Sequence, residues 1–447
     1  MTMILTETAS RLASGSLSAR DHVESCLAAI DCEDGARAFI TVNADTARKQ
    51  ANRIDKLRAA GAALPPFAGV TLSVKDLFDI AGEVTTAGSR VLADARPAAR
   101  DATVLARLRA AGFIVIGRTN MTEFAYSGLG MNPHYGNPRS PFGRDQGSGR
   151  VAGGSSSGSA VSICDDMAAA TIGTDTGGST RAPAAFCGIT GMKPTTTRMP
   201  SQGVYPLSTS FDAAGPMAGS VDCCAILDDL MTGGEGRAET PFPVAGLRLA
   251  MPRGYLFDDL DPEIAAAFDA AVDRLSAAGA IVSDIRLDII EDLRPANRPK
   301  SIVSAEAYEI HRDMLARRHD GYDPYVAARL AAGADISAAD FIAMTRERAA
   351  TCAAVQAVTR PYDALLLPTT PALPLPLDGM EGVETLMKAS ARILRNTALS
   401  NYLDRPAITM PCHRPGAAPV GLSLMGSRGH DRRLLAIAAG IERVVGG

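Results

Sequence analysis

Strand-like and helix-like segments alternate along most of this chain. Residues 69–75 (GVTLSVK) alternate like a strand that ends at Lys75, and residues 101–111 read as an amphipathic helix that leads into a buried strand at 113–117. The same order recurs at the strand-like stretches 247–251, 280–287, 363–368, 406–411 and 421–426 and the helix-like stretches 18–31 (N-cap Ser18), 262–278, 336–358 and 431–445. Strands that alternate with helices predict an α/β fold with a mainly parallel or mixed sheet.

The chain has no obvious point of division. Its 447 residues alone would suggest about three domains, but that is only a length-based prior. No Pro/Gly/Ser-rich linker and no internal repeat separates one part from another. We therefore expect a single domain that spans residues 1–447.

Composition excludes several classes of partner. Lys and Arg total 45 against 49 Asp and Glu, and there is no Trp, so neither nucleic acid nor an anionic membrane surface is expected as a partner. The eight Cys form no C-x-x-C pair and no metal-ligand spacing, which favours reduced thiols and no bound metal. The N-terminus is a poor signal peptide, and no run approaches the ~18 apolar residues of a membrane span. These features predict a cytoplasmic protein.

One segment, residues 147–191, breaks the alternating pattern. It holds ten Gly and seven Ser in 45 residues, yet apolar stretches such as AVSIC and MAAATIG interrupt it. A flexible linker would lack those stretches, whereas glycines between buried elements mark places where the backbone approaches another backbone or a ligand. We interpret the segment as a system of functional loops.

Within this segment, residues 174–179 (TDTGGS) have the residue types that a nucleophilic serine site requires. A serine hydroxyl needs a base to take its proton and donors where an oxyanion forms. The two glycines before Ser179 allow a backbone nest, in which the amides of residues 176–179 converge on one anion. A phosphate-binding P-loop is disfavoured, because that motif needs Lys after its last Gly, and Ser179 follows Gly178 here.

A second serine motif competes with this interpretation. Residues 154–158 (GSSSG) match G-x-S-x-G, the nucleophile elbow of α/β-hydrolases, with Ser156 as the nucleophile. An elbow needs a strand directly before it and a histidine partner after it. The preceding GRDQGSGRVAGG is no strand, and none of the four later histidines has a recognisable context. An α/β-hydrolase-type esterase therefore remains only an alternative.

The two motifs together carry a family resemblance. GGSSSGSA (153–160) and GTDTGGSTRAPAAFCGITGMKPT (173–195) look like the signature of the amidase signature family. The resemblance extends to PFAGVTLSVKDLFDIAG, GRTNMTEFAYSG, NPHYGNPRSP, SFDAAGPMAGSV, DALLLPTTP and PAITMPCHRPGAAPVGLSLMG, and so covers nearly the whole chain. It implies that family's fold, a twisted mixed β-sheet flanked by α-helices, and a cofactor-free amide hydrolase.

The resemblance also implies roles for single residues. The family's Ser–cisSer–Lys triad falls on Ser179 as nucleophile, Ser155 as proton bridge and Lys75 as base, with a cis peptide bond before Ser155. The amides of Thr176, Gly177, Gly178 and Ser179 take the oxyanion role, and Ser156 is an accessory hydrogen-bond partner. Ser127, in the loop 125–131, and Thr174 match positions at the family's acyl pocket.

The chemistry of the matched residues fits these roles. A lysine that is buried at a strand end has a lowered pKa and can act as a neutral base near neutral pH. Asp175 and Arg181 flank the nucleophile, and we expect them to hold the nest as a charge-assisted pair. A carboxylate-binding role for Arg181 is the lesser alternative.

The predicted function is hydrolysis of a small-molecule amide through an acyl-enzyme. Esters, ureas and carbamates stay open as substrates, and the variable acyl-binding positions fall within 125–135 and 289–345. An amidotransferase subunit that supplies ammonia to a partner protein carries the same triad and is the main alternative. A homodimer is also left open.

Overall fold

The computed structural model describes residues 3–293 and 300–446, so part of the predicted acyl-binding range, 294–299, lies outside the described residues. The strands are β1 (Phe39–Val42), β2 (Thr71–Lys75), β3 (Ile114–Thr119), β4 (Ala170–Asp175), β5 (Thr190–Lys193), β6 (Ala213–Ala218), β7 (Arg248–Arg253), β8 (Ile281–Arg286), β9 (Ala364–Pro368), β10 (Ala407–Pro411) and β11 (Gly421–Met425). The helices are α1 (Leu5–Ala13), α2 (Ala19–Ile30), α3 (Glu33–Ala38), α4 (Ala44–Ala59), α5 (Thr103–Ala110), α6 (Ser157–Cys164), α7 (Arg181–Cys187), α8 (Val221–Thr232), α9 (Pro262–Ala277), α10 (Ile302–Arg318), α11 (Pro324–Ala331), α12 (Ala338–Thr359), α13 (Val383–Leu394), α14 (Ala398–Tyr402) and α15 (Asp431–Val445).

All of these strands join one sheet in the order β1-β3-β2-β4-β6-β5-β10-β11-β9-β7-β8. The pairs β2–β3, β2–β4, β7–β8 and β7–β9 are parallel, and the other pairs are antiparallel. The sheet is therefore mixed, as predicted. The carboxyl ends of β2 and β4 point the same way, so both strands deliver their last residues to one edge of the sheet.

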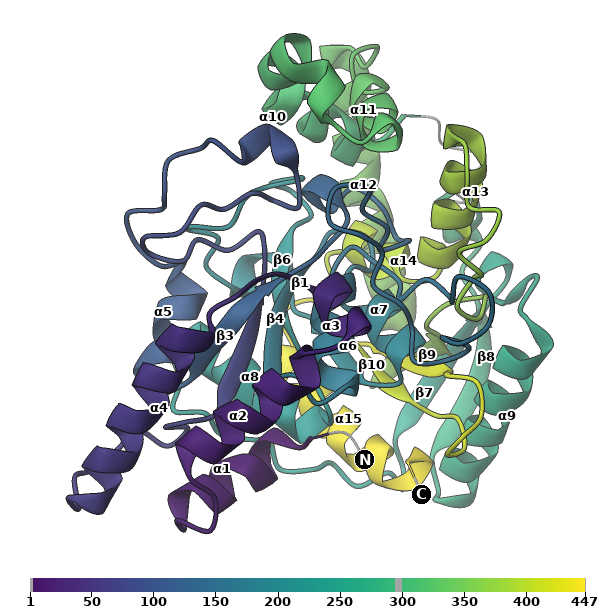
Figure 1. Cartoon of the computed structure of the whole chain (residues 1–447). Coiled ribbons are helices and arrows are strands. Elements are labelled where there is room, and N and C mark those ends of the chain that lie inside the picture. The colour runs from purple at the N-terminus through teal and green to yellow at the C-terminus, as the bar shows by residue number, and fades with distance from the viewer. Residues whose placement is uncertain (1–2, 294–299, 447) are drawn as a thin grey trace.

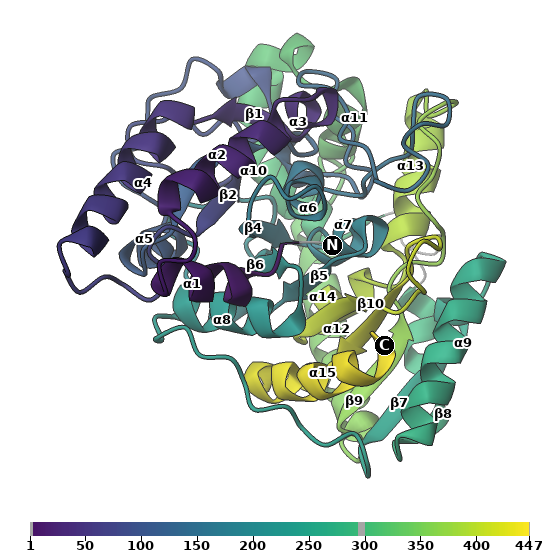
Figure 2. The same ribbon diagram turned by 60° about the horizontal axis from the view of Figure 1, so that its bottom comes forward.

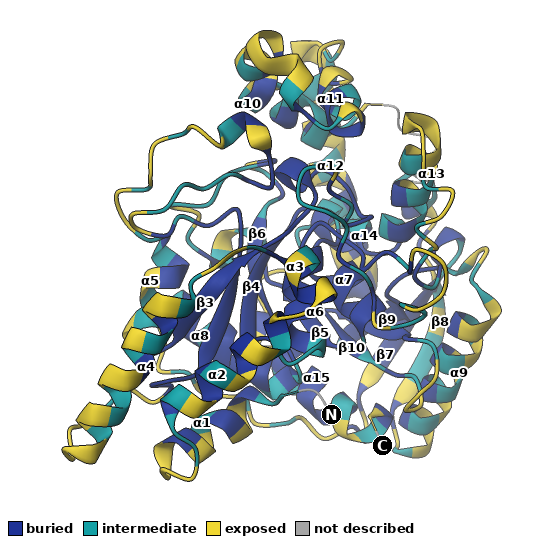
Figure 3. Cartoon of the chain, in the orientation of Figure 1, coloured by how far each residue is buried: buried dark blue, intermediate teal, exposed yellow. Residues whose placement is uncertain are grey.

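Helices cover both faces of this sheet. Figure 2 shows the strands between α6 and α7 on one side and α8 and α15 on the other. Helices α10 and α11 lie beyond one end of the sheet, at the top of Figure 1, whereas α12 also reaches the sheet, where its Val355 belongs to the same hydrophobic cluster as Leu365 and Met425. In Figure 3 the strands at the centre of the sheet are buried, while the outer helices α1, α4 and α9 expose one side to solvent. Among the described residues, no helix combines the length and apolar character needed to cross a membrane.

Most of the alternation read from the sequence is confirmed. Strands β2, β3, β7, β8, β9, β10 and β11 lie where they are predicted, as do α5, α9, α12 and α15. The predicted N-cap is also present, since the Ser18 side chain accepts a hydrogen bond from the Asp21 amide at the start of α2. Strands β4, β5 and β6 have no predicted counterpart. Their sequences, ATIGTD, TGMK and AAGPMA, contain one Ile and two Met as their large apolar residues, and each contains Gly, which is depleted in strands.

A buried ion pair fixes the end of β2, where Lys75 lies. The Arg118 guanidinium, on β3, donates from Nη1 to Asp76 Oδ1 at 3.1 Å, and both side chains are almost fully buried. The same nitrogen donates to the Phe78 carbonyl at 2.9 Å. Asp76 also accepts from the Gly88 amide at 3.0 Å. These contacts hold the first residue after the strand against its neighbour in the sheet.

We predict that Arg118→Met destabilises the fold by about 3–5 kcal/mol, because it leaves the Asp76 carboxylate buried without its cation. The measurement is the free energy of unfolding from urea titration. Arg286→Met is the matched control: Arg286 pairs with Asp288 at 3.3 Å, but both side chains are exposed, and such pairs add little. Equal stability of the two variants would contradict the prediction.

Candidate active site

Lys75 is the last residue of β2, and its side chain is completely buried. Its Nζ donates to Ser155 Oγ at 2.7 Å and to Thr174 Oγ1 at 2.9 Å. Burial lowers the pKa of Lys75 to about 7, and the negative charges of Asp212 and Asp175 oppose that shift without cancelling it. The amine therefore changes protonation state near neutral pH, while it lies within hydrogen-bond distance of a serine.

Ser155 lies in a loop that immediately precedes α6. The Gly154–Ser155 peptide bond is cis, and the Ser155 carbonyl accepts from the Thr122 amide at 3.1 Å. The loop is packed so tightly that a Cβ on Gly154 would stand 2.4 Å from the Gly130 amide nitrogen. Gly154 is thus required by the close approach of another backbone segment, as the glycine content of this region predicts.

Ser179 lies in the turn between β4 and α7. Its carbonyl accepts from the Ser156 amide at 3.2 Å, so the two glycine-rich loops are in direct backbone contact. The Ser179 side chain is 3% exposed and belongs to the wall of a cavity of about 460 Å³. The structure thus brings Lys75, Ser155 and Thr174 into hydrogen-bond contact and sets the Ser179 loop beside them.

The backbone nest differs from the prediction at one residue. The Gly178 amide donates to Asp175 Oδ1 at 2.8 Å, so it is already paired and is not an open oxyanion donor. The amides of Thr176, Gly177 and Ser179 have no hydrogen-bond acceptor in the part of the chain that the structure describes. Three of the four predicted donors are therefore free to bind an anion.

Asp175 and Arg181 form the predicted pair, completely buried at the base of this turn. Arg181 donates from Nη2 to Asp175 Oδ1 at 2.9 Å and from Nε to Oδ2 at 3.1 Å. Burial by itself would raise the pKa of Asp175, but the Arg181 guanidinium outweighs it and holds that pKa far below its usual range. Arg181 also donates to the Thr397 carbonyl and to Asn401 Oδ1. Its donors face inward, so the alternative of a carboxylate-binding Arg181 is wrong.

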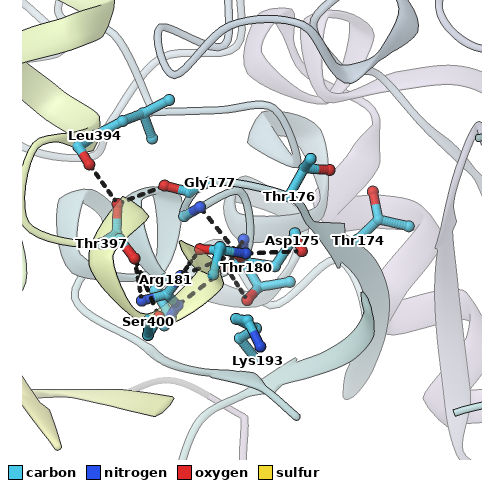
Figure 4. Close-up of polar contacts among 12 residues, drawn as sticks. Thr174, Asp175, Thr176, Gly177, Thr180, Arg181, Lys193, Leu394, Thr397 and Ser400 are labelled. Atoms are coloured by element: carbon cyan, nitrogen blue, oxygen red, sulfur yellow. Dashed lines mark hydrogen bonds and ion pairs between the residues drawn. The ribbon is translucent and has the colours of Figure 1, made fainter. Parts of the chain in front are cut away.

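Three polar residues of the site were missed from the sequence. The Asp212 carboxylate accepts from the Thr176 hydroxyl and from the Leu207 and Ser208 amides, and burial raises its pKa to about 6. Asn401 donates to Asp175 Oδ1 at 2.9 Å, and the Thr397 hydroxyl donates to the Gly177 carbonyl at 2.8 Å (Figure 4). Asp212 lies in the SFDAAGPMAGSV segment matched to the family, which was the one available signal. Thr397 and Asn401 lie in no quoted motif.

The cavity in front of Ser179 has mostly apolar walls. They come from the loop at 125–127, from residues 293 and 300–304, and from α11, α12, α13 and α14. Ser127 lines the cavity, as predicted, and its Oγ donates to Ser390 Oγ at 3.4 Å. Thr174 is not among the described lining residues. Its hydroxyl accepts a hydrogen bond from Lys75 Nζ, so Thr174 lies beside the predicted base.

The competing serine motif lacks the surroundings of a nucleophile elbow. Ser156 immediately precedes α6, and the strand that leads directly into a serine turn is β4, before Ser179. The Ser156 hydroxyl donates to the Thr174 carbonyl at 3.4 Å, which fits an accessory role. No histidine occurs among the described residues that line the cavity.

The chain is similar to known amidases along nearly its whole length. The Amidase family model matches residues 21–435. A 2-amino-5-chloromuconic acid deaminase of Comamonas testosteroni is 36% identical, over 99% of this chain and 96% of that protein. A glutamyl-tRNA(Gln) amidotransferase subunit from Roseiflexus sp. is 32% identical, over 99% and 96%. A solved amidase crystal structure superposes with a TM-score of 0.89 at 30% identity, over 99% of this chain and 100% of that one. The chain belongs to the amidase signature family.

Proposed function

We propose that this enzyme hydrolyses small amides through an acyl-enzyme on Ser179, with Ser155 as proton bridge and Lys75 as base. The observation that carries the proposal is the completely buried Lys75 amine, 2.7 Å from Ser155 Oγ, beside a turn with open amides. A base with a pKa near 7 is half deprotonated at neutral pH, which suits proton abstraction from a serine.

The reaction follows from these positions. Ser179 Oγ attacks the amide carbonyl carbon, its proton passes to Ser155, and the proton of Ser155 passes to Lys75. The amides of Thr176, Gly177 and Ser179 stabilise the oxyanion. When the tetrahedral intermediate collapses, the C–N bond breaks and the proton returns through Ser155 to the departing amine. Water then attacks the acyl-enzyme by the same proton route and releases the acid.

The hydrogen bond between Lys75 and Ser155 can form in both protonation states of Lys75. The ammonium form donates to Ser155 Oγ, whereas the neutral amine accepts from the Ser155 hydroxyl. The same heavy-atom distance of 2.7 Å suits either hydrogen bond. Thr174, 2.9 Å from Nζ, holds the amine in place in both states.

An amidotransferase subunit is the second candidate, because the relative from Roseiflexus sp. bears that name and matches this chain over nearly its full length. A hydrolase acts alone, whereas such a subunit serves a partner protein. Hydrolysis of simple amides by the purified chain without any partner supports the hydrolase. Activity that appears only with a partner supports the amidotransferase.

We predict that a fluorophosphonate probe labels Ser179, which peptide mass spectrometry locates. Ser179→Ala should abolish the labelling, and Ser155→Ala should slow it by roughly 10²-fold or more because the proton route is broken. Ser156→Ala, which removes the neighbouring hydroxyl in the same loop, is the matched control and should have a smaller effect. Label found on Ser156 and retained in Ser179→Ala would support the esterase alternative instead.

We predict that kcat/KM rises with pH through about 7, because only deprotonated Lys75 accepts the proton. Asp212→Asn should move this rise to lower pH: the Asp212 carboxylate raises the pKa of Lys75, so its loss lowers that pKa further. Asp175 remains as the other negative charge that acts on Lys75. The measurement is a pH profile of both proteins. A rise at the same pH in both would show that another group limits the rate.

We also propose that the substrate carries a negative charge, and the lining of the cavity supports this. Its described lining includes Lys300, Arg329 and Arg395 but no Asp or Glu. Lys300 is paired with Asp340 outside the cavity. Arg329 stacks 4.0 Å from the Tyr126 ring and donates to the Tyr126 carbonyl, and it has no acidic partner among the described residues. A cation without an anion in a largely apolar cavity favours an acyl group that carries a carboxylate.

We predict that the enzyme prefers the monoamide of a dicarboxylic acid over the matching uncharged amide of equal length. Arg329→Met should lower kcat/KM for the charged substrate by roughly 10- to 100-fold, the value of a hydrogen bond to a charged group, and leave the uncharged one little changed. Arg286→Met, an exposed arginine in β8, is the control. Equal losses for both substrates would contradict a carboxylate-binding role.

A further inference from the structure

We propose that Thr397 is a positioning residue of the oxyanion site, which fixes the orientation of the Gly177–Gly178 peptide through its side-chain hydroxyl. The proposal rests on the function proposed above. Thr397 lies between α13 and α14, 218 residues beyond the nucleophile in the sequence, and touches none of the reacting atoms.

The Gly177–Gly178 peptide is held at both of its polar ends. Thr397 Oγ1 donates to the Gly177 carbonyl at 2.8 Å (Figure 4). The Gly178 amide donates to Asp175 Oδ1 at 2.8 Å. Because a peptide group is planar, two anchors on opposite sides fix its plane. The amides of Gly177 and Ser179 belong to the peptides on either side of it, and they are two of the open amides of the nest.

Two consecutive glycines make external support necessary. Glycine has the widest conformational freedom, so a Gly-Gly pair does not hold a peptide plane by itself. Gly178 has φ +134°, and a Cβ there would stand 2.0 Å from Thr397 Oγ1 and 3.0 Å from Leu394 Cδ2. Thr397 and Leu394 thus pack directly on the loop. Thr397 and Leu394 occupy the space that a side chain on Gly178 would fill.

Thr397 is itself rigidly placed. Its carbonyl accepts from Arg181 Nη1 at 3.0 Å and from Ser400 Oγ at 3.0 Å. Its hydroxyl is 3.2 Å from the Leu394 carbonyl, a longer contact than the one with Gly177. The buried Asp175–Arg181 pair therefore reaches the Gly177–Gly178 peptide by two routes, directly through Asp175 and indirectly through Thr397.

The test compares Thr397→Val with Thr397→Ser. Valine keeps the shape but removes the hydroxyl, and serine keeps the hydroxyl. We expect Thr397→Val to lower kcat by roughly 10- to 10³-fold, up to the loss of one oxyanion donor, with little change in KM. The rate of fluorophosphonate labelling at Ser179 should fall in parallel, because the phosphonyl oxygen needs the same amides. Thr397→Ser should restore both.

Thr232→Val is the matched control, since it removes a threonine hydroxyl that donates only to the Asp228 and Asp229 carbonyls within α8. It should leave kcat and labelling close to wild type. If Thr397→Val does not fold, Thr397→Ala replaces it in the comparison with Thr397→Ser.

Three results would overturn the role of Thr397: wild-type kcat and labelling in Thr397→Val, a loss that Thr397→Ser does not restore, or an equal loss in Thr232→Val. Failure of the proposed function looks different. In that case the wild-type protein itself is not labelled at Ser179, whatever residue 397 is.

Discussion

The buried carboxylate of Asp175 organises the end of the sheet that carries the proposed active site. Among the described residues it accepts from the Gly178 and Thr180 amides, the Thr180 hydroxyl, the Arg181 guanidinium and the Asn401 amide group. A buried charge is tolerated only when it is paired and hydrogen-bonded, so the Asp175 carboxylate needs these partners in order to stay ionised. The turn from β4 to α7, which carries Ser179, is shaped around that anion.

A second constraint is the burial of Lys75, which favours the neutral form of its side chain, whereas Asp175 stays charged. Asp175 gains enough partners to stay ionised, whereas Lys75 finds two hydroxyls and no directly bonded carboxylate in the described structure. Desolvation therefore dominates and lowers its pKa to about 7. Lys75 and Asp175 lie about 100 residues apart in sequence, and both are buried, but their partners differ. Asp175 therefore stays charged, whereas Lys75 can exchange a proton.

The sequence predicted those features of the structure that depend on local sequence patterns. Strand β2 and the N-cap Ser18 follow from alternation and capping, and the glycine-rich loops around Ser155 and Ser179 follow from composition. Contacts across long sequence separations left no such pattern. Thr397 is 220 residues from Gly177 in the sequence, and it lies in no motif that marks it. The open or paired state of the Gly178 amide is likewise set by three-dimensional geometry, which is why that one donor was assigned wrongly.

Long-range contacts of the same kind connect the wall of the cavity to the Gly177–Gly178 peptide. Leu394 and Ala398 line the cavity, while Thr397, between them in sequence, bonds the Gly177 carbonyl. The other cavity walls, from residues 300–304 and from α11 and α12, have no hydrogen bond to residues 176–179 in the described part of the chain. Under the proposed mechanism, substitutions in those walls change which acyl group fits without moving the proposed oxyanion donors. Substitutions within 394–398 alter both at once, because one short segment lines the cavity on one side and supports the Gly177–Gly178 peptide on the other.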